Sequence, residues 1–293
     1  MTTRGQEAGA APNAEHIAVW NDVLVPKFLR FRKVMVDGLG AHGEIALRRH
    51  PVAAGERVLD VGCGFGETSL ELGRAVGPRG AVLGIDVCEP FLDVARDDAR
   101  AAGLTNVRFQ NADAQIESFE PTFDVCFSRF GTMFFQGPVA ALRNLRAALR
   151  PAGRLLMLVW RRTDENEWAS LPKRIARAHL PPPPEQAPTC GPGPFSMADP
   201  TTVRQMLSAA GWRDIEIEPV NTQMTVGETV EDAVEFQLSI GPAGEIVREA
   251  KEHGVAQRPA IERALAATLK PHATPRGVLL SAASWCVTAG RGP

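Results

Sequence analysis

The chain has 293 residues, of which 44% are hydrophobic and 23% are charged, as is usual for a globular protein in water. Its formal net charge of −2 provides no basic field for polyanions, so we expect no nucleic-acid partner. The first residues lack the apolar core of a signal peptide, and apolar runs such as Leu155–Trp160 are far shorter than a membrane span. We therefore expect a cytoplasmic protein without a membrane partner.

The counts of cysteine and tyrosine narrow the chemistry. The cysteines are scattered, without the close spacing typical of a metal site, so we expect reduced, buried thiols and no bound metal. The chain has no tyrosine, so no phenol can act as a base or a hydrogen-bond donor in a site. Aromatic pocket walls must come from its 13 phenylalanines and 5 tryptophans. The cysteines are Cys63, Cys88, Cys126, Cys190 and Cys286.

A strand followed by a glycine-rich loop is the most informative part of the chain. Residues 56–68 read ERVLDVGCGFGET, an aliphatic run that ends in Gly62, Gly64 and Gly66. Glycine permits a sharp turn and lets a ligand lie against main-chain N–H groups, so the pattern predicts a cofactor site at the end of a buried strand. The spacing is G-x-G-x-G, whereas dinucleotide sites use G-x-G-x-x-G. Because Asp60 would repel a phosphate, a ligand that carries an ammonium group fits better than NAD.

Acidic residues follow the next two expected strands. Residues 81–85 form the second strand, and Asp86 comes 20 residues after Gly66, where a carboxylate can accept hydrogen bonds from both hydroxyls of a ribose. A lone acid at this place is also a common helix N-cap, so both interpretations stand. The third strand begins at Val107 and is followed by Asp113, which taken alone would equally well cap a turn.

The segment Asp60–Gly66 resembles motif I of the class I S-adenosylmethionine-dependent methyltransferases, and the downstream acids keep the order of that family's motifs. Within the family, the chain is similar to the small-molecule C-methylases of ubiquinone and menaquinone. The resemblance implies S-adenosyl-L-methionine as the cofactor, with Asp86 on the ribose and Asp113 on the adenine amino group. The cofactor-binding residues that we expect are Asp60, Gly62, Cys63, Gly64, Gly66, Asp86, Val87, Asp113, Ala114 and Ser128.

The resemblance also implies an α/β fold, a Rossmann-like sheet of seven strands in the order 3-2-1-4-5-7-6 with the last strand antiparallel. In the family the last two strands form a hairpin, but here more than 50 residues separate them, so we expect an inserted cap over the site. The expected segments are a disordered tail (1–13), N-terminal lid helices (14–50), the cofactor-binding core (51–160), a loop-rich insertion (161–200), a continuation of the core (201–226), a helical cap (227–276), and the final strand with a tail (277–293).

The N-terminal helices carry a second expectation from the family. Apolar residues at helical spacing predict two or three helices within residues 14–50, interrupted near a proline and near the glycines of residues 38–43. In related proteins the first of these helices folds over the cofactor cleft as a lid, which would place His16, Trp20 and Asn21 there. Packing of Trp20 on the core is an equally good interpretation.

Three further residues are open between a role in the site and ordinary structure. For Arg129, at the end of the fourth strand, we favour a salt bridge to a surface carboxylate over a contact with a substrate. In the segment GPGPF, alternating glycine and proline fix the backbone. Phe195 and Met197 therefore either line the pocket or pack in the core.

We predict an enzyme, an S-adenosylmethionine-dependent methyltransferase that acts on a small, fairly apolar organic acceptor, with transfer to carbon or oxygen favoured. The alternatives are a non-catalytic protein that binds S-adenosylmethionine or S-adenosylhomocysteine, and an NAD(P)-dependent oxidoreductase, which the glycine spacing disfavours. A base could be His16, His179, His272 or a carboxylate of the cap, but the sequence identifies no catalytic residue. A homodimer is left open, and the high content of Ala, Arg, Gly and Pro indicates a bacterial source.

Overall fold

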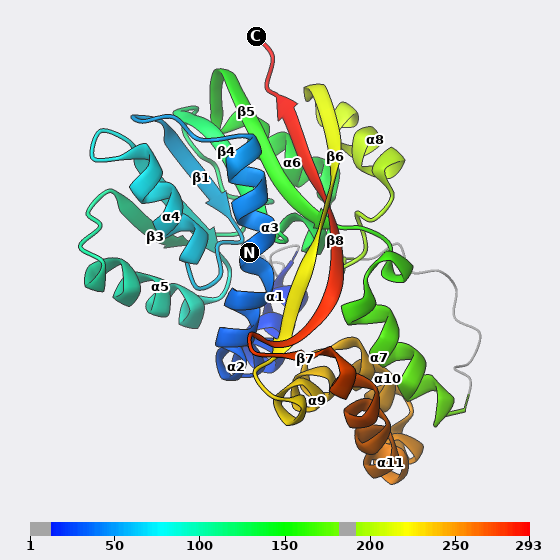
Figure 1. Ribbon diagram of the computed structural model, residues 1–293. Coiled ribbons are helices and arrows are strands. Elements are labelled where there is room, and N and C mark those ends of the chain that lie inside the picture. The colour runs from blue at the N-terminus through cyan, green and yellow to red at the C-terminus, as the bar shows by residue number, and fades with distance from the viewer. Residues whose placement is uncertain (1–12, 182–191) are drawn as a thin grey trace, which may run out of the picture.

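The computed structural model describes residues 13–181 and 192–293. Its strands are β1 (Arg57–Val61), β2 (Ala81–Asp86), β3 (Val107–Asn111), β4 (Phe123–Arg129), β5 (Leu149–Trp160), β6 (Arg213–Gly227), β7 (Ala273–Thr274) and β8 (Gly277–Gly290). They form one sheet in the order β3-β2-β1-β4-β5-β8-β6, with the short β7 paired to β8 (Figure 1). The strands β1 to β5 are parallel, whereas β8 is antiparallel to both β5 and β6. Apart from β7, this is the order that we predicted, and the fold class is confirmed.

Eleven α-helices of the described residues surround this sheet. They are α1 (Ala14–Val19), α2 (Val25–Arg30), α3 (Arg32–Arg49), α4 (Glu67–Val76), α5 (Glu89–Ala101), α6 (Pro138–Ala147), α7 (Glu167–Ala178), α8 (Pro200–Ala209), α9 (Val230–Ser239), α10 (Pro242–Glu249) and α11 (Lys251–Leu269). A π-helical turn, Trp20–Leu24, joins α1 to α2. Helices α4 and α5 pack on the strands β1 to β3, α3 packs on β5 and β6, and α7, α9, α10 and α11 pack on one another as a cap below the sheet (Figure 1). Within the described ranges, no helix is long and apolar enough to cross a membrane.

The central strands are buried on both faces. Four of the five residues of β1 are buried, and in β4 every residue before Arg129 is buried. A strand covered by helices on both faces has no exposed face to carry polar residues, so its sequence is a continuous apolar run rather than an alternation. This burial fixes the ends of β1 and β4 next to each other, which is where the glycine loop begins.

The expected interruption of the N-terminal helices at residues 38–43 is wrong, because α3 runs without a break from Arg32 to Arg49. The glycines instead allow close packing. A Cβ atom on Gly38 would lie 2.9 Å from the Met224 Cγ atom and from the Thr225 carbonyl oxygen of β6. The cost of glycine within a helix is therefore offset by the close approach of α3 to β6.

The segment 161–200 is less loop-rich than we expected, because it contains the 12 residues of α7. Trp168, Leu171 and Ile175 recur at helical spacing and face the core, and this apolar stripe outweighs the proline inside the helix. Residues 1–12 of the expected N-terminal tail and residues 182–191, which include Cys190, lie outside the described residues, whereas Asn13 is described and buried. The other four cysteines are free and buried.

Candidate functional site

A cavity of about 290 Å³ lies at the carboxyl ends of the parallel strands. In parallel α/β sheets, this edge is where loops meet and ligands bind. The walls come from the loops after β1 to β4, from the N-terminal helices and from the cap. All but two of the predicted cofactor-binding residues line it, namely Asp60, Gly62, Cys63, Gly64, Asp86, Val87, Asp113 and Ala114.

Asp86 holds the glycine loop in place. One of its carboxylate oxygens accepts a hydrogen bond from the Gly64 N–H group at 2.9 Å, and the other accepts one from Cys88 N–H at 3.0 Å. Burial raises the pKa of Asp86, while these N–H donors act in the opposite direction. The side chain therefore joins the loop after β1 to the loop after β2 and also lines the cavity.

The three glycines of the loop have different tasks, although all have left-handed φ angles of 54° to 82°. A Cβ atom on Gly62 would lie 2.9 Å from the Gly131 Cα atom, so this glycine permits two loops to touch. A Cβ atom on Gly66 would lie 2.7 Å from the Ala95 Cβ atom, and Gly66 does not line the cavity. Only Gly64 faces open space, with no protein atom within 4 Å of a Cβ atom. Gly66 therefore serves the packing of α4, and its expected contact with the cofactor is not seen in the lining.

Asp60 is a buried carboxylate at the bottom of the cavity. Only 1% of its surface is exposed, and it accepts a hydrogen bond of 2.5 Å from the Ser69 hydroxyl. Burial raises its pKa to about 6, although the Ser69 hydrogen bond and the positive charge of Arg129 lower it. A cationic group in the cavity would stabilise the ionised form of Asp60.

Asp113 and the N-terminal segment close one end of the cavity. The side chain of Asn13 donates a hydrogen bond of 2.5 Å to the Asp113 carboxylate, which also accepts the Gln115 N–H group at 2.9 Å. The Asn21 side chain donates to the carbonyl oxygen of Val87 at 3.2 Å, so the same segment also crosses the loop after β2.

Trp20 belongs to the lining of the cavity. Its ring packs edge-on against Phe134 with 5.0 Å between the centroids. The side chain of His16 lies outside the described part of the structure. Asn13 and Trp20 therefore line the cavity, Asn21 contacts the loop after β2, and a lid function of this segment stays a prediction.

Ser128 does not line the cavity, in contrast to the other polar residues that we expected at the cofactor. Its side chain is fully buried, and its hydroxyl group donates a hydrogen bond of 2.8 Å to the carbonyl oxygen of Val61. Ser128 therefore fastens the end of β4 to the end of β1. The sequence places a residue along a strand but does not determine which face of a doubly covered strand it occupies.

Arg129 lines the cavity and does not form the surface salt bridge that we favoured. Within residues 13–181 and 192–293, no carboxylate lies close enough to its guanidinium group to form an ion pair. The next residue, Phe130, has a left-handed φ angle of 62°, which costs a non-glycine residue on the order of 1 kcal/mol. In a regular strand, successive side chains point to opposite faces. The left-handed angle at Phe130 ends this alternation, so Arg129 and Phe130 both face the cavity.

Aromatic side chains form the far wall of the cavity. The rings of Phe130 and Trp160 stack with 4.0 Å between their centroids, and Trp168 lies 5.0 Å from Trp160. Phe195 stacks behind Trp168 and Met197 is buried in the core, so neither is the pocket wall that we considered. The remaining apolar lining includes Phe28, Met35, Leu39, Met133, Phe134, Phe135, Pro194, Met224, Phe236 and Ile240.

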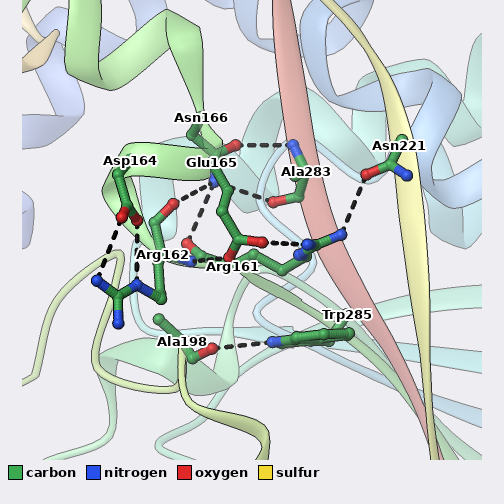
Figure 2. Close-up of polar contacts among 9 residues, drawn as sticks. All are labelled: Arg161, Arg162, Asp164, Glu165, Asn166, Ala198, Asn221, Ala283 and Trp285. Carbon is green, nitrogen blue, oxygen red and sulfur yellow. Dashed lines mark hydrogen bonds and ion pairs between the residues drawn. The ribbon is translucent and has the colours of Figure 1, made fainter.

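Asn166 is a residue that the sequence reasoning missed, and it positions this wall. Its side chain is buried and exchanges hydrogen bonds with both main-chain groups of Ala283 on β8, at 2.8 and 3.1 Å (Figure 2). Its carbonyl oxygen also accepts the indole N–H group of Trp168 at 3.0 Å. Asn166 therefore fastens the start of α7 to the sheet and sets the orientation of Trp168.

Outside this cavity, three side chains that could bind a metal lie close together, although the sequence led us to expect no metal site. Atoms of His50, Glu218 and Cys286 lie within 4.8 Å of one another. His50 and Glu218 already pair with each other at 2.9 Å, and burial raises the pKa of the Cys286 thiol to about 12. A structural interaction between α3, β6 and β8 accounts for the group.

Comparison with known families finds a match for part of the chain. Residues 58–153 match the family described as a methyltransferase domain. This part of the chain is similar to the domains of S-adenosylmethionine-dependent methyltransferases. A ubiquinone/menaquinone biosynthesis C-methyltransferase from Bdellovibrio bacteriovorus is 37% identical over 106 residues, which are 36% of this chain and 44% of that protein. The chain therefore matches less than half the length of this relative, and the match is confined to the domain.

Solved structures extend the likeness to the fold of most of the chain. The methyltransferase domain fold is shared with the YcgJ protein from Bacillus subtilis, with a TM-score of 0.55 and 17% identity over 86% of this chain and 99% of that one. A phosphoethanolamine N-methyltransferase from Haemonchus contortus, solved with S-adenosylhomocysteine, has a TM-score of 0.52 and 18% identity over 86% of this chain and 53% of that one. At these identities, the comparison establishes the fold alone.

Proposed function

We propose that this protein transfers the methyl group of S-adenosylmethionine to a carbon or oxygen atom of a small, fairly apolar organic acceptor. The observation that carries the proposal is the single cavity in which the acids at the ends of β1, β2 and β3 continue into an aromatic wall. The first part offers polar groups to a cofactor, and the second part offers an apolar surface to an acceptor. The family of residues 58–153 supports the same activity.

The polar part of the cavity fits the groups of S-adenosylmethionine in chain order. Asp60 is a buried carboxylate beside the loop and suits the ammonium group of the methionine moiety. Asp86 keeps lone pairs for the ribose hydroxyls after it has accepted the two loop N–H groups. Asp113 suits the adenine amino group, and the open space over Gly64 leaves the loop accessible to the ligand.

When bound, S-adenosylmethionine supplies a methyl group on a positively charged sulfur. The residues of this chain then have to align the acceptor, exclude water and, where the acceptor keeps a proton, remove it. Trp20 and the aromatic wall around Trp160 and Trp168 exclude water, and aromatic faces also stabilise a nearby cation. We infer that the lid segment and the cap both close over the bound pair.

The class of acceptor is inferred from the wall. The relative from Bdellovibrio bacteriovorus is named for ubiquinone and menaquinone biosynthesis, so a ring compound is a reasonable acceptor for this chain as well. The stacked rings of Phe130 and Trp160 offer a flat apolar surface to such a ring. Transfer to carbon or oxygen of a ring compound is consistent with this surface.

The proposal is tested by incubating the purified protein with radiolabelled S-adenosylmethionine and a panel of phenols, hydroquinones, ring carboxylates and amines. We expect formation of S-adenosylhomocysteine that depends on at least one ring compound and that falls strongly in an Asp86→Ala variant. Binding of the cofactor without turnover of any acceptor would favour the non-catalytic binding protein instead.

A further inference from the structure

We propose that Arg129 is the acceptor-recognition residue, and that the acceptor is an aromatic ring compound carrying a negative charge, as a carboxylate or an ionised hydroxyl group. This inference rests on the proposed methyltransferase function and deepens it. It follows from the position of one guanidinium group inside a cavity whose wall is otherwise apolar on the acceptor side.

Charged side chains are unevenly distributed along the cavity. The other ionisable residues of the described lining lie on the loops and strand ends assigned to the cofactor: Asp60, Cys63, Glu67, Asp86 and Asp113. Arg129 is the only cationic residue of the described lining. The wall beyond it is built from aromatic rings, aliphatic chains and methionines. An acceptor that meets this wall therefore meets one fixed positive charge.

Arg129 has no ion-pair partner within the described part of the chain. Most of the other half-buried arginines are paired, as Arg154 is with Glu56 and Arg161 with Glu165. Asp60 and Glu71 sense the charge of Arg129 from a distance, but neither forms a salt bridge with it. A guanidinium group in an apolar surrounding gains much from an anion, because it can donate two parallel hydrogen bonds to a carboxylate.

The backbone geometry at Phe130 favours the inward position of Arg129. The left-handed φ angle of Phe130, 62°, stores strain of a kind that is common at functional sites. The stack on Trp160 and a main-chain hydrogen bond from Phe130 to Leu158 at 3.0 Å hold this conformation. Gly43 of α3 lies beside the arginine, where a Cβ atom would be in van der Waals contact with the Arg129 Cδ atom at 3.4 Å.

The chemistry of the reaction suits an anionic acceptor. No histidine belongs to the lining within the described residues, and its carboxylates lie on the cofactor side. An acceptor that is methylated on its own ionised oxygen needs no base. An electron pair of that oxygen forms the new bond to the methyl carbon, while the bond between that carbon and sulfur breaks with its electrons moving to sulfur. The charge of the oxygen and the charge of the sulfonium are both removed in this step, whereas transfer to a ring carbon would also require loss of the proton on that carbon.

The test compares two probes that differ only in charge, 2-naphthoate and 2-naphthamide. Binding to the protein saturated with S-adenosylhomocysteine is followed by the fluorescence of the cavity tryptophans. We expect the wild type to bind 2-naphthoate at least about tenfold more tightly than 2-naphthamide. An Arg129→Gln variant should bind both within about twofold, and Arg129→Lys should keep part of the preference.

Two controls separate this role from the alternatives. Arg108→Gln removes the same charge from an exposed position on β3 and should keep the full preference for the anion. Titration of S-adenosylhomocysteine and of methylthioadenosine, which lacks the amino-acid group, shows whether Arg129 serves the cofactor. A loss of affinity in Arg129→Gln for the first compound but not the second would assign Arg129 to the cofactor carboxylate and overturn the inference.

An equal affinity of the wild type for the two naphthalene probes would also overturn it, as would a preference that survives in Arg129→Gln. Failure of S-adenosylhomocysteine to bind the wild type would instead overturn the proposed function. The two failures are therefore distinguishable within one set of titrations.

Discussion

Replacing Asp60 with asparagine should make the protein more stable and less able to bind its cofactor. The carboxylate is buried, and burial raises its pKa from 3.8 to about 6. One pKa unit corresponds to about 1.4 kcal/mol, so keeping Asp60 ionised in the folded protein costs about 3 kcal/mol. The asparagine side chain can still accept the hydrogen bond from Ser69, but it carries no charge to bury.

The dependence on pH follows from the same values. Between about pH 4 and pH 6 the folded protein holds a proton on Asp60 that the unfolded chain has released. Stability of the wild type therefore falls as the pH rises through this range, and the contribution is fully lost above it. We expect Asp60→Asn to be about 1–3 kcal/mol more stable than the wild type near pH 7.5 and equal to it near pH 4.

Urea unfolding at the two pH values measures this difference, and titration with S-adenosylhomocysteine should show at least about tenfold weaker binding. Asp124→Asn is the matched control, because Asp124 is equally buried but pairs with Arg150 and accepts the Arg57 N–H group at 2.8 Å. That variant should lose stability at neutral pH. An Asp60→Asn variant that is less stable than the wild type near pH 7.5, or that binds S-adenosylhomocysteine normally, would refute the reasoning.

Two further substitutions test the glycine loop and its support. Asp86→Ala should weaken binding of S-adenosylhomocysteine by about 1.5–3 kcal/mol, measured by calorimetry, because charge-assisted hydrogen bonds to the ribose are lost; unchanged affinity would remove Asp86 from the site. Gly66→Ala should lower the urea midpoint more than Gly103→Ala, because both glycines have positive φ angles but only the Cβ atom at Gly66 meets other atoms closer than 3 Å. Equal losses in the two variants would show that backbone strain alone explains the requirement for glycine at position 66.

The first strands and most of the residues at their carboxyl ends that line the cavity could be predicted because local sequence patterns encode them, whereas the order of the strands in the sheet was implied by the resemblance to a family. A run of buried aliphatic residues that ends in closely spaced glycines describes a strand and its loop, and Asp86 follows at a fixed distance along the chain. The contacts of Asp86 with Gly64 and Cys88 are consistent with that prediction.

The acceptor side could not be predicted, because it depends on contacts between distant segments. The left-handed turn at Phe130, which lets Arg129 and Phe130 both face the cavity, is marked by no turn residue in the sequence. Asn166 acts through β8, more than a hundred residues away in the chain. The helical stripe of α7 was a detectable signal, but the proline inside it concealed the helix.

The most direct test of the central claim is calorimetric titration of the purified protein with S-adenosylmethionine, S-adenosylhomocysteine and NADH side by side. We expect the protein to bind the two sulfur compounds in the micromolar range and not to bind NADH. Binding of NADH without binding of the sulfur compounds would contradict it, because the acids beside the glycine loop would then hold a dinucleotide.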